Sequence, residues 1–403
     1  MTTRTTIALA LATAMIALPL QAAQPLLGAR SNDQVPTRVE RAPAPTDSIE
    51  QAPLRFAWAL DPAQALSPPA PHLASSRSYW EMVEAPALQQ GLALPLTAPG
   101  AVIQVSPVRG ARALAPSQWQ LRDPAGALAV ESVVDDQQLR AAGMAVGQGS
   151  AMVRTGAAAP AGTYRLQSAQ AQGRYVVQVL EPHSTIALEL QADRQQVLAG
   201  DTLTLSARLV DDGGRATAQA GRTLGARPLP AGGEALLVAP DGRSWPVPLV
   251  KNGEALSARV AIPRDAGQVQ GLWELQAFVS AAGVQRDAKV AFAVAVPTAR
   301  FAGQLSADPA ARSVQLPLQV GAPGRYEARG TLYATGPDGT LRPVAQAHSA
   351  AWFGKAGAGS LTLAFAQAAL PAGFGAPFEL RGLELHDQSR MAPIEQRSRA
   401  ARF

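Results

Sequence analysis

Short segments with apolar side chains at every second position recur along this chain, punctuated by Gly, Pro and Asp. From residue 77 onward, no long run shows the spacing of an amphipathic helix. Because successive side chains of a strand point to opposite faces, each such segment can bury one face and expose the other. We therefore predict an all-β fold made of sheets packed face to face.

The pattern is clearest between residues 185 and 296. About seven alternating strands in such a stretch are typical of an immunoglobulin-like (Ig-like) sandwich, in which half of each strand faces a shared core. Residues 211–214, Asp-Asp-Gly-Gly, fit a hairpin turn, since Asp and Gly tolerate positive φ. The predicted strands cover residues 185–190, 202–210, 234–239, 245–249, 256–262, 272–280 and 289–296.

One layout occurs three times along the chain. A strand, a Pro-x-Gly turn and a second strand are followed, after a gap, by Gly and an aromatic-x-Leu strand. The two side chains of each aromatic-x-Leu pair should lie on the inner face of a central strand. We therefore predict three related sandwiches, each with its own core. The turns lie at 124–126, 240–242 and 337–339, and the pairs are Tyr164 with Leu166, Trp273 with Leu275 and Phe378 with Leu380.

The first 23 residues resemble a secretory signal peptide in their layout. Arg4 supplies a positive start, residues 7–20 carry no charge, and small residues allow cleavage after Ala22 or Ala23. A buried core helix or a transmembrane anchor is the alternative, although the run is short for a membrane span. We predict export to the bacterial periplasm or to the medium, with no membrane anchor after cleavage.

Residues 24–76 are predicted to be a Pro-rich arm, because closely spaced Pro residues prevent a sustained helix and favour extended backbone. Within the arm, residues 54–60 alternate with the strand period. We predict an edge strand docked on the domain that follows; a segment offered to the sheet of a partner is the alternative. The full division is a signal peptide at 1–23, the arm at 24–76, an N-terminal β-sandwich at 77–183, an Ig-like β-sandwich at 184–297 and a C-terminal β-sandwich at 298–403.

The chain contains no Cys among its 403 residues. Disulfide scaffolds, thiol nucleophiles, iron–sulfur clusters and Cys-type zinc sites are thereby excluded. The formal charge of +5 comes almost wholly from scattered Arg, with Lys only at 251, 289 and 355, which is weak support for nucleic-acid binding. We predict no nucleic-acid partner and no cofactor.

Candidate catalytic groups are sparse: the chain has no zinc-hydrolase spacing of His, no nucleophile elbow and no P-loop. A hydrolase would pair His386 with Asp387 and Ser389. Neighbours on a strand point to opposite faces, which does not build a triad, so we expect a C-terminal turn or a domain contact there. The four His residues are His72, His183, His348 and His386.

Two Asp pairs, at 135–136 and 211–212, have the oxygen ligands that Ca²⁺ prefers. Neither pair has an EF-hand pattern or further acidic residues nearby, so we expect solvated turns. We therefore predict no catalytic, cofactor-binding or metal-ligating residue.

The Trp residues divide into two groups. Trp245 and Trp273 fall on inward strand positions and should lie in the core. Periodicity places residues 79–80 (Tyr-Trp) and 352–353 (Trp-Phe) less clearly. For these pairs the alternatives are core packing and an exposed aromatic platform that stacks on a sugar ring or a peptide.

Six stretches carry a family resemblance: residues 78–80, 98–102, 181–184, 271–275, 296–300 and 386–391. Through them the chain resembles the domain of unknown function 4785 family of exported gammaproteobacterial proteins. Separately, residues 199–203 are similar to Ig-like modules of secreted bacterial proteases and adhesins. The resemblance implies export and tandem β-domains, and it implies no reaction and no catalytic residue.

These features favour a non-enzymatic binding or structural protein of the bacterial envelope or extracellular space. It would act through the surfaces of tandem sandwiches, with a protein or glycan as its ligand. A secreted hydrolase or a protease-accessory protein is the alternative, motivated by the similarity to modules of secreted proteases.

Overall fold

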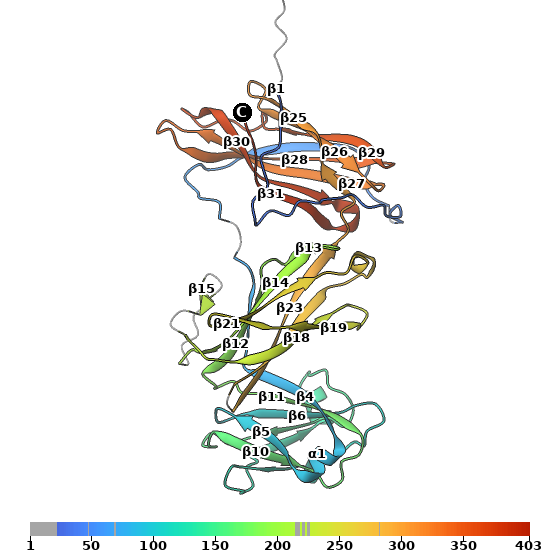
Figure 1. Ribbon diagram of the computed structural model, residues 1–403, viewed down its shortest axis with the longest axis vertical. Coiled ribbons are helices and arrows are strands. Elements are labelled where there is room, and N and C mark those ends of the chain that lie inside the picture. The colour runs from blue at the N-terminus through green and yellow to red at the C-terminus, as the bar shows by residue number, and fades with distance from the viewer. Residues whose placement is uncertain are drawn as a thin grey trace, which may run out of the picture. The chain divides into compact units, whose positions relative to one another are not determined.

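The computed structural model describes residues 22–46, 48–67, 70–213, 218–219, 222–223, 226–281 and 283–403. Most of the predicted signal peptide and the last residue of the predicted 211–214 turn therefore lie outside the described residues. The chain divides into two compact units (Figure 1). The middle unit is Pro68–Val296, and the terminal unit combines the described residues up to Ser67 with Pro297–Phe403.

Antiparallel β-structure dominates both units, which confirms the predicted fold class. Short helices occur only at a few connections of the described chain. They are α1 (Ala85–Gln90), α2 (Asp136–Ala141) and the 3₁₀ turns η1 (Pro116–Gln118), η2 (Ala266–Gln268) and η3 (Gln388–Arg390).

The first sandwich of the middle unit encloses a core built around buried Tyr79, Ile103, Leu121, Tyr164 and Tyr175. One of its layers is the sheet β5 (Leu92–Leu96), β10 (Gly162–Gln167) and β7 (Gln120–Arg122), in spatial order. The other layer, also in spatial order, is β4 (Ser78–Glu84), β11 (Arg174–Leu180), β6 (Val102–Pro107), β9 (Ala151–Arg154) and β8 (Ser132–Asp135).

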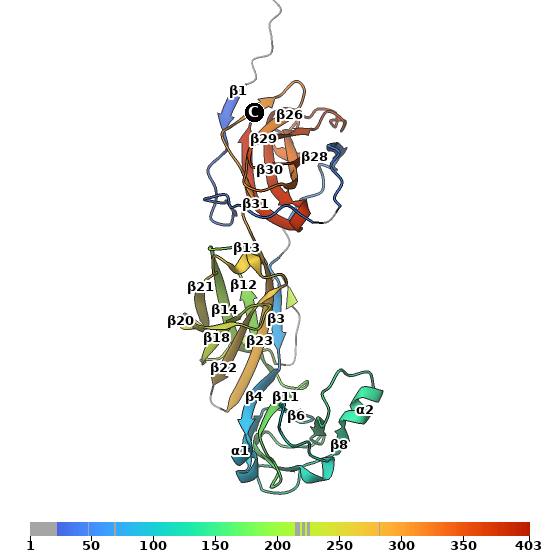
Figure 2. The same ribbon diagram turned by 90° about the vertical axis from the view of Figure 1, so that its right-hand side faces the viewer.

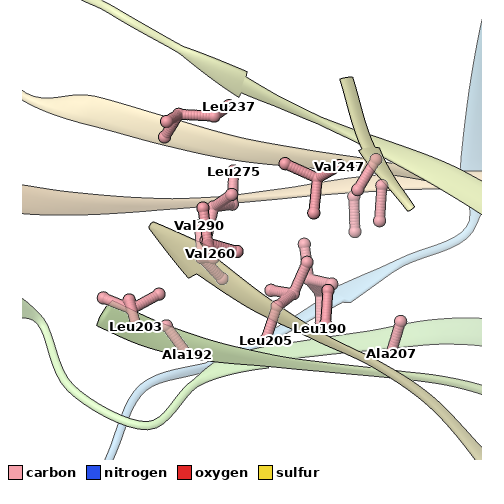
Figure 3. Close-up of a cluster of buried hydrophobic side chains, with 14 of the residues drawn as sticks. Leu190, Ala192, Leu203, Leu205, Ala207, Leu237, Val247, Val260, Leu275 and Val290 are labelled. Atoms are coloured by element: carbon pink, nitrogen blue, oxygen red, sulfur yellow. The ribbon is translucent and has the colours of Figure 1, made fainter. Parts of the chain in front are cut away.

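The second sandwich of the middle unit has a separate core, in which Leu205, Leu275 and Val290 meet from facing strands (Figure 3). One layer is β20 (Val250–Asn252), β21 (Ala255–Ala261), β14 (Thr202–Asp211), β12 (Ile186–Ala192) and β3 (Leu73–Ser76), with β17 (Arg227–Pro228) beside β14. The other is β19 (Ser244–Pro248), β18 (Gly232–Val238), β22 (Trp273–Ala281) and β23 (Val284–Ala295), with β13 (Gln196–Leu198) parallel to β23. A short ribbon joins β15 (Ala218–Gln219) to β16 (Arg222–Thr223).

The terminal unit is a third sandwich, completed by the arm (Figure 2). Its first sheet is β1 (Ala22–Pro25), β25 (Gln304–Asp308), β26 (Ser313–Val320) and β24 (Ala299–Phe301), with β29 (Gly357–Ala364) beside β26. Its second sheet is β2 (Leu54–Ala59), β28 (Leu341–Phe353), β27 (Gly324–Thr335), β30 (Gly375–Asp387) and β31 (Ala392–Arg402).

The three aromatic-x-Leu pairs occupy the positions that the sequence layout predicts. All six side chains are buried, from Tyr164 and Leu166 in the first sandwich to Phe378 and Leu380 in the terminal unit. The glycines that close the three Pro-x-Gly turns share a left-handed backbone, which glycine adopts at low cost. Their φ values are 88° at Gly126, 87° at Gly242 and 76° at Gly339.

The prediction that the arm strand docks on the domain that follows it is wrong. β2 pairs instead with β28 of the terminal unit, with Leu54 opposite Ala350 and Phe56 opposite His348. The alternation in β2 indicates a strand, but it does not specify the partner, because any free sheet edge can accept an extended segment. Phe56 remains 37% exposed in this pairing.

Arginines of the terminal unit bind carbonyl groups of the arm between its two strands. Arg325 Nη1 donates to Glu50 O and Ala52 O, each at 2.7 Å. Arg390 Nη2 donates to Pro43 O at 2.6 Å. Charged donors satisfy arm carbonyls that have no sheet partner, so the Pro-rich segment follows a defined path along the unit.

Candidate functional site

The two sandwiches of the middle unit share one ten-stranded sheet. β23 of the second sandwich pairs with β4 of the first through the single register pair Asp287 and Ser78. Such a short pairing cannot by itself fix the angle between two sandwiches, so side chains around the junction have to supply further contacts.

Arg286 supplies most of these contacts from the strand position next to Asp287. Its side chain is 0% exposed and forms a 2.7 Å ion pair with Glu181, which is also 0% exposed. Its guanidinium also donates to Ile186 O at 3.0 Å and Gln285 O at 2.7 Å. The hydroxyls of Thr97 and Ser184 accept the remaining two hydrogen bonds, each at 2.9 Å.

Glu181 is held from the side of the first sandwich. Its Oε1 accepts hydrogen bonds from the backbone N–H groups of Thr97 and Ala98 and from the Thr97 hydroxyl. Burial lowers the pKa of the Arg286 guanidinium, and the pairing with Glu181 opposes that shift. The two sandwiches are therefore joined by a desolvated ion pair, in which Glu181 Oε1 accepts hydrogen bonds and Oε2 contacts the guanidinium without a hydrogen bond.

A cleft of about 400 Å³ lies beside this junction. Register places Glu234 opposite Phe278, and Phe278 opposite Asp287, in one row across the outer face of the shared sheet. Trp80 on β4 is 36% exposed, and its ring meets Phe278 edge-on at 5.5 Å. The lining consists of Tyr79, Trp80, Gly233, Glu234, Phe278, Val279, Ser280, Gln285 and Arg286.

The polar side chains at the rim of the cleft have no partners. Glu234, Ser280 and Gln285 are exposed, and their side chains make no hydrogen bond or ion pair with any described residue. Arg286 differs from them, because its guanidinium donates four hydrogen bonds and forms an ion pair with Glu181. The cleft thus presents free hydrogen-bonding groups without a free cation.

Asp287 fixes the backbone of Trp80 at the junction of the two sandwiches. Its Oδ2 accepts a hydrogen bond from the Trp80 N–H at 2.8 Å. Burial raises the pKa of Asp287 to about 6. The carboxyl at the junction of the two sandwiches therefore changes its charge just below neutral pH.

We expect replacement of Asp287 by Asn to change the pH dependence of stability. A carboxyl whose pKa is higher in the folded chain holds more protons when folded, so stability falls as pH rises from about 4 to about 6. Asp287→Asn keeps an oxygen for the Trp80 N–H and should be more stable than the parent at pH 7 by about 1 kcal/mol, allowing for solvent screening. Urea unfolding of both proteins at several pH values checks this; parallel profiles would refute it.

A second polar cluster lies on the terminal unit, around His348. Rings of Phe56 and Trp58 from β2 stack on the imidazole at 4.9 Å and 5.0 Å. Its Nδ1 lies 2.5 Å from Glu327 Oε1, and this hydrogen bond lowers the pKa of the Glu327 carboxyl. Gln388 donates to the other Glu327 oxygen at 2.7 Å. Because the His348 imidazole stacks on two rings of β2 and is itself held by Glu327, we assign this cluster to holding β2 in place.

The proposed hydrolase residues do not form a triad. His386 Nε2 lies 2.8 Å from Glu384. Asp387 is 0% exposed and accepts from Thr298 at 2.7 Å, and it forms an ion pair with Arg390 at 2.6 Å. Ser389 Oγ accepts from the backbone N–H of residue 325 at 2.7 Å. The 386–390 cluster forms a turn that supports contact with the arm.

The two Asp pairs are caps and ion pairs. Asp135 caps α2 by accepting the Gln138 N–H at 2.9 Å, and Asp136 pairs with Arg140 at 2.7 Å. Asp212 is buried and forms an ion pair with Arg77. Among the described residues no group of three or more His, Asp or Glu is arranged to hold a metal ion. Nor does the described part of the chain contain a helix long and apolar enough to cross a membrane.

The remaining aromatic residues follow the sequence analysis in part. Trp273 is 1% exposed, which confirms its core position, whereas Trp245 is partly buried and stacks on Trp273 at 5.8 Å from the edge of the core. In the 79–80 pair, Tyr79 is buried and Trp80 is exposed. Periodicity alone does not single out Trp80, because its partner Phe278 lies almost two hundred positions further along the sequence.

The described chain contains three sandwiches built mainly of antiparallel strands, and two of these sandwiches share one sheet. The protein is therefore a multidomain β-sandwich protein. The model of the DUF4785 (domain of unknown function) N-terminal domain matches residues 45–181, and that of the DUF4785 C-terminal domain matches residues 298–403. The chain belongs to the DUF4785 family. The region matched by the N-terminal domain includes β2, which the structure pairs with β28 of the terminal unit.

A solved structure supports the fold. The crystal structure of a DUF4785 family protein from Legionella pneumophila is similar, with a TM-score of 0.65 and 18% identity. The similarity covers 91% of this chain and 98% of that chain. No curated protein matches the sequence.

Proposed function

We propose that this protein is an exported, non-enzymatic binding protein that acts through the surfaces of its tandem sandwiches. The cleft between the two sandwiches of the middle unit carries the proposal. Its volume of about 400 Å³ is in the range of small-ligand sites. The exposed Trp80 ring offers a stacking surface, and the polar side chains beside it can hydrogen-bond to a ligand.

Export is part of the proposal and rests on the sequence. The uncharged run at residues 7–20 after Arg4, with small residues following it, supports secretion. The hydrolase alternative has no comparable support, because His386, Asp387 and Ser389 each engage a different partner. We therefore propose no reaction for this chain.

Fractionation and a ligand screen test the proposal together. The tagged protein should appear in the periplasm or the medium of its bacterial host, with a mass that shows the loss of about the first 23 residues. The purified mature chain should retain a ligand from panels of glycans, peptidoglycan fragments and envelope proteins, and mass spectrometry should show that the ligand is unaltered. Cytoplasmic recovery, release of reaction products, or failure to retain anything would refute the proposal.

A further inference from the structure

The cleft beside Arg286 has features that select among ligand classes, and the following inference rests on the proposed binding function. We propose that this cleft binds a neutral saccharide, with Trp80 stacking on a sugar ring while Glu234, Ser280 and Gln285 hydrogen-bond to its hydroxyl groups. The cleft then serves as a carbohydrate site at the junction of the two sandwiches.

Anionic ligands are disfavoured by the charges around the cleft. Arg286 is the cation in the lining, and its guanidinium already donates four hydrogen bonds and pairs with Glu181. The free carboxylate of Glu234 repels an anion, and Asp287 in the same cross-strand row adds further negative charge at neutral pH. A phosphate or carboxylate would meet no free donor with a positive charge.

The remaining free groups match hydroxyls better than an ammonium group. The Ser280 hydroxyl and the Gln285 amide can each donate and accept a hydrogen bond, as sugar hydroxyls do. Glu234 adds an acceptor. An ammonium or guanidinium ligand only donates, so it would leave the donors of Ser280 and Gln285 unused.

The aromatic side of the cleft suits the apolar face of a sugar ring. Trp80 is 36% exposed, and Phe278 meets it at an interplanar angle of 77°, so the two rings form a corner. Gly233 lines the cleft without a side chain. The cleft is therefore apolar on one side and polar on the other, as a pyranose ring is.

Titration of the purified mature chain with neutral di- to tetrasaccharides tests the inference. The probes are the gluco-, chito- and xylo-oligosaccharide series, followed by calorimetry and by Trp fluorescence. Trp80→Ala should weaken binding about tenfold or more. Trp58→Ala is the matched control, since Trp58 is 41% exposed but lies in the other unit, and it should leave affinity unchanged. Trp80→Phe retains a ring and should bind with intermediate affinity.

The effects of the Glu234 charge and of salt on affinity distinguish a neutral saccharide from a cationic peptide or a phosphate. Glu234→Gln keeps an acceptor and should change affinity for a neutral saccharide less than about threefold, with little effect of salt. Lys-containing tripeptides and inorganic phosphate serve as comparison probes. Peptide binding that is lost in Glu234→Gln and weakened by salt would overturn the saccharide inference while leaving the binding function intact. Saccharide binding unaffected by Trp80→Ala would also overturn it, and failure of every probe and panel would refute both proposals.

Discussion

Replacement of Arg286 by Met is expected to lower the free energy of unfolding of the middle unit by about 3–5 kcal/mol. The variant leaves Glu181 as a buried carboxylate without a cationic partner, and an unpaired buried charge is strongly destabilising. It also removes the donors that hold the Thr97 and Ser184 hydroxyls. Urea denaturation at pH 7, followed by fluorescence of the core Trp residues, measures the loss.

A double variant identifies the cause. Glu181→Gln retains an oxygen for the backbone N–H groups of residues 97 and 98 but removes the charge, so Arg286→Met with Glu181→Gln should be more stable than Arg286→Met alone. Arg243→Met is the matched control, because Arg243 is 50% exposed and pairs with Asp241 on the surface. That change should cost less than about 1 kcal/mol. Equal losses in the buried and exposed variants would contradict the role assigned to Arg286.

Removal of residues 24–60, the arm that follows the proposed signal peptide, is expected to destabilise the terminal unit by several kcal/mol, which is a large share of the stability of a domain. The deletion removes β2 from one sheet, shortens β1 in the other and leaves Arg325 and Arg390 without the arm carbonyls that they bind. Each net hydrogen bond contributes about 1 kcal/mol, and the uncovered edges can pair with other chains. Denaturation and light scattering should therefore show a lower midpoint together with aggregation.

A cut chain provides the control for the deletion. A protease site inserted in the exposed segment at 61–67 allows the arm to be severed without being removed. The severed arm should stay bound to the body during gel filtration and preserve the unfolding midpoint. Release of the arm after cleavage, or a deletion variant as stable as the parent, would show that the arm is not a structural part of the unit.

Local patterns in the sequence were sufficient to predict the cores. Tyr164, Trp273 and Phe378 are buried together with the Leu two positions later, because a strand in a sandwich must place alternate residues inward. The Pro-x-Gly turns were predictable for the same reason, since the left-handed backbone of Gly126 or Gly242 is a local requirement. These features depend on a few neighbouring residues, which one sequence contains.

Features that depend on distant residues could not be predicted. The predicted boundary between the first and second sandwiches lies at residues 183 and 184, yet Glu181 and Ser184 on either side of it are partners of Arg286, about a hundred positions away. A lone Arg on a strand gives no sign that it is buried, because most Arg residues are exposed. The cleft likewise requires Trp80 and Phe278 to meet across strands of different sandwiches. Sequence spacing carries no information on such a meeting.

The pairing of β2 with β28 also determines the order in which the chain can fold. Leu54 is synthesised early but finds its partner only when Ala350 has emerged, so the closing loop spans nearly three hundred residues. The middle unit contains its own contacts and can fold before that moment. Until then the arm strand has no sheet partner. Its closely spaced Pro residues hinder aggregation during that interval, because Pro has no backbone N–H to donate to another sheet. Folding of the last sandwich therefore ends when it binds the arm, which precedes it by almost the whole described chain.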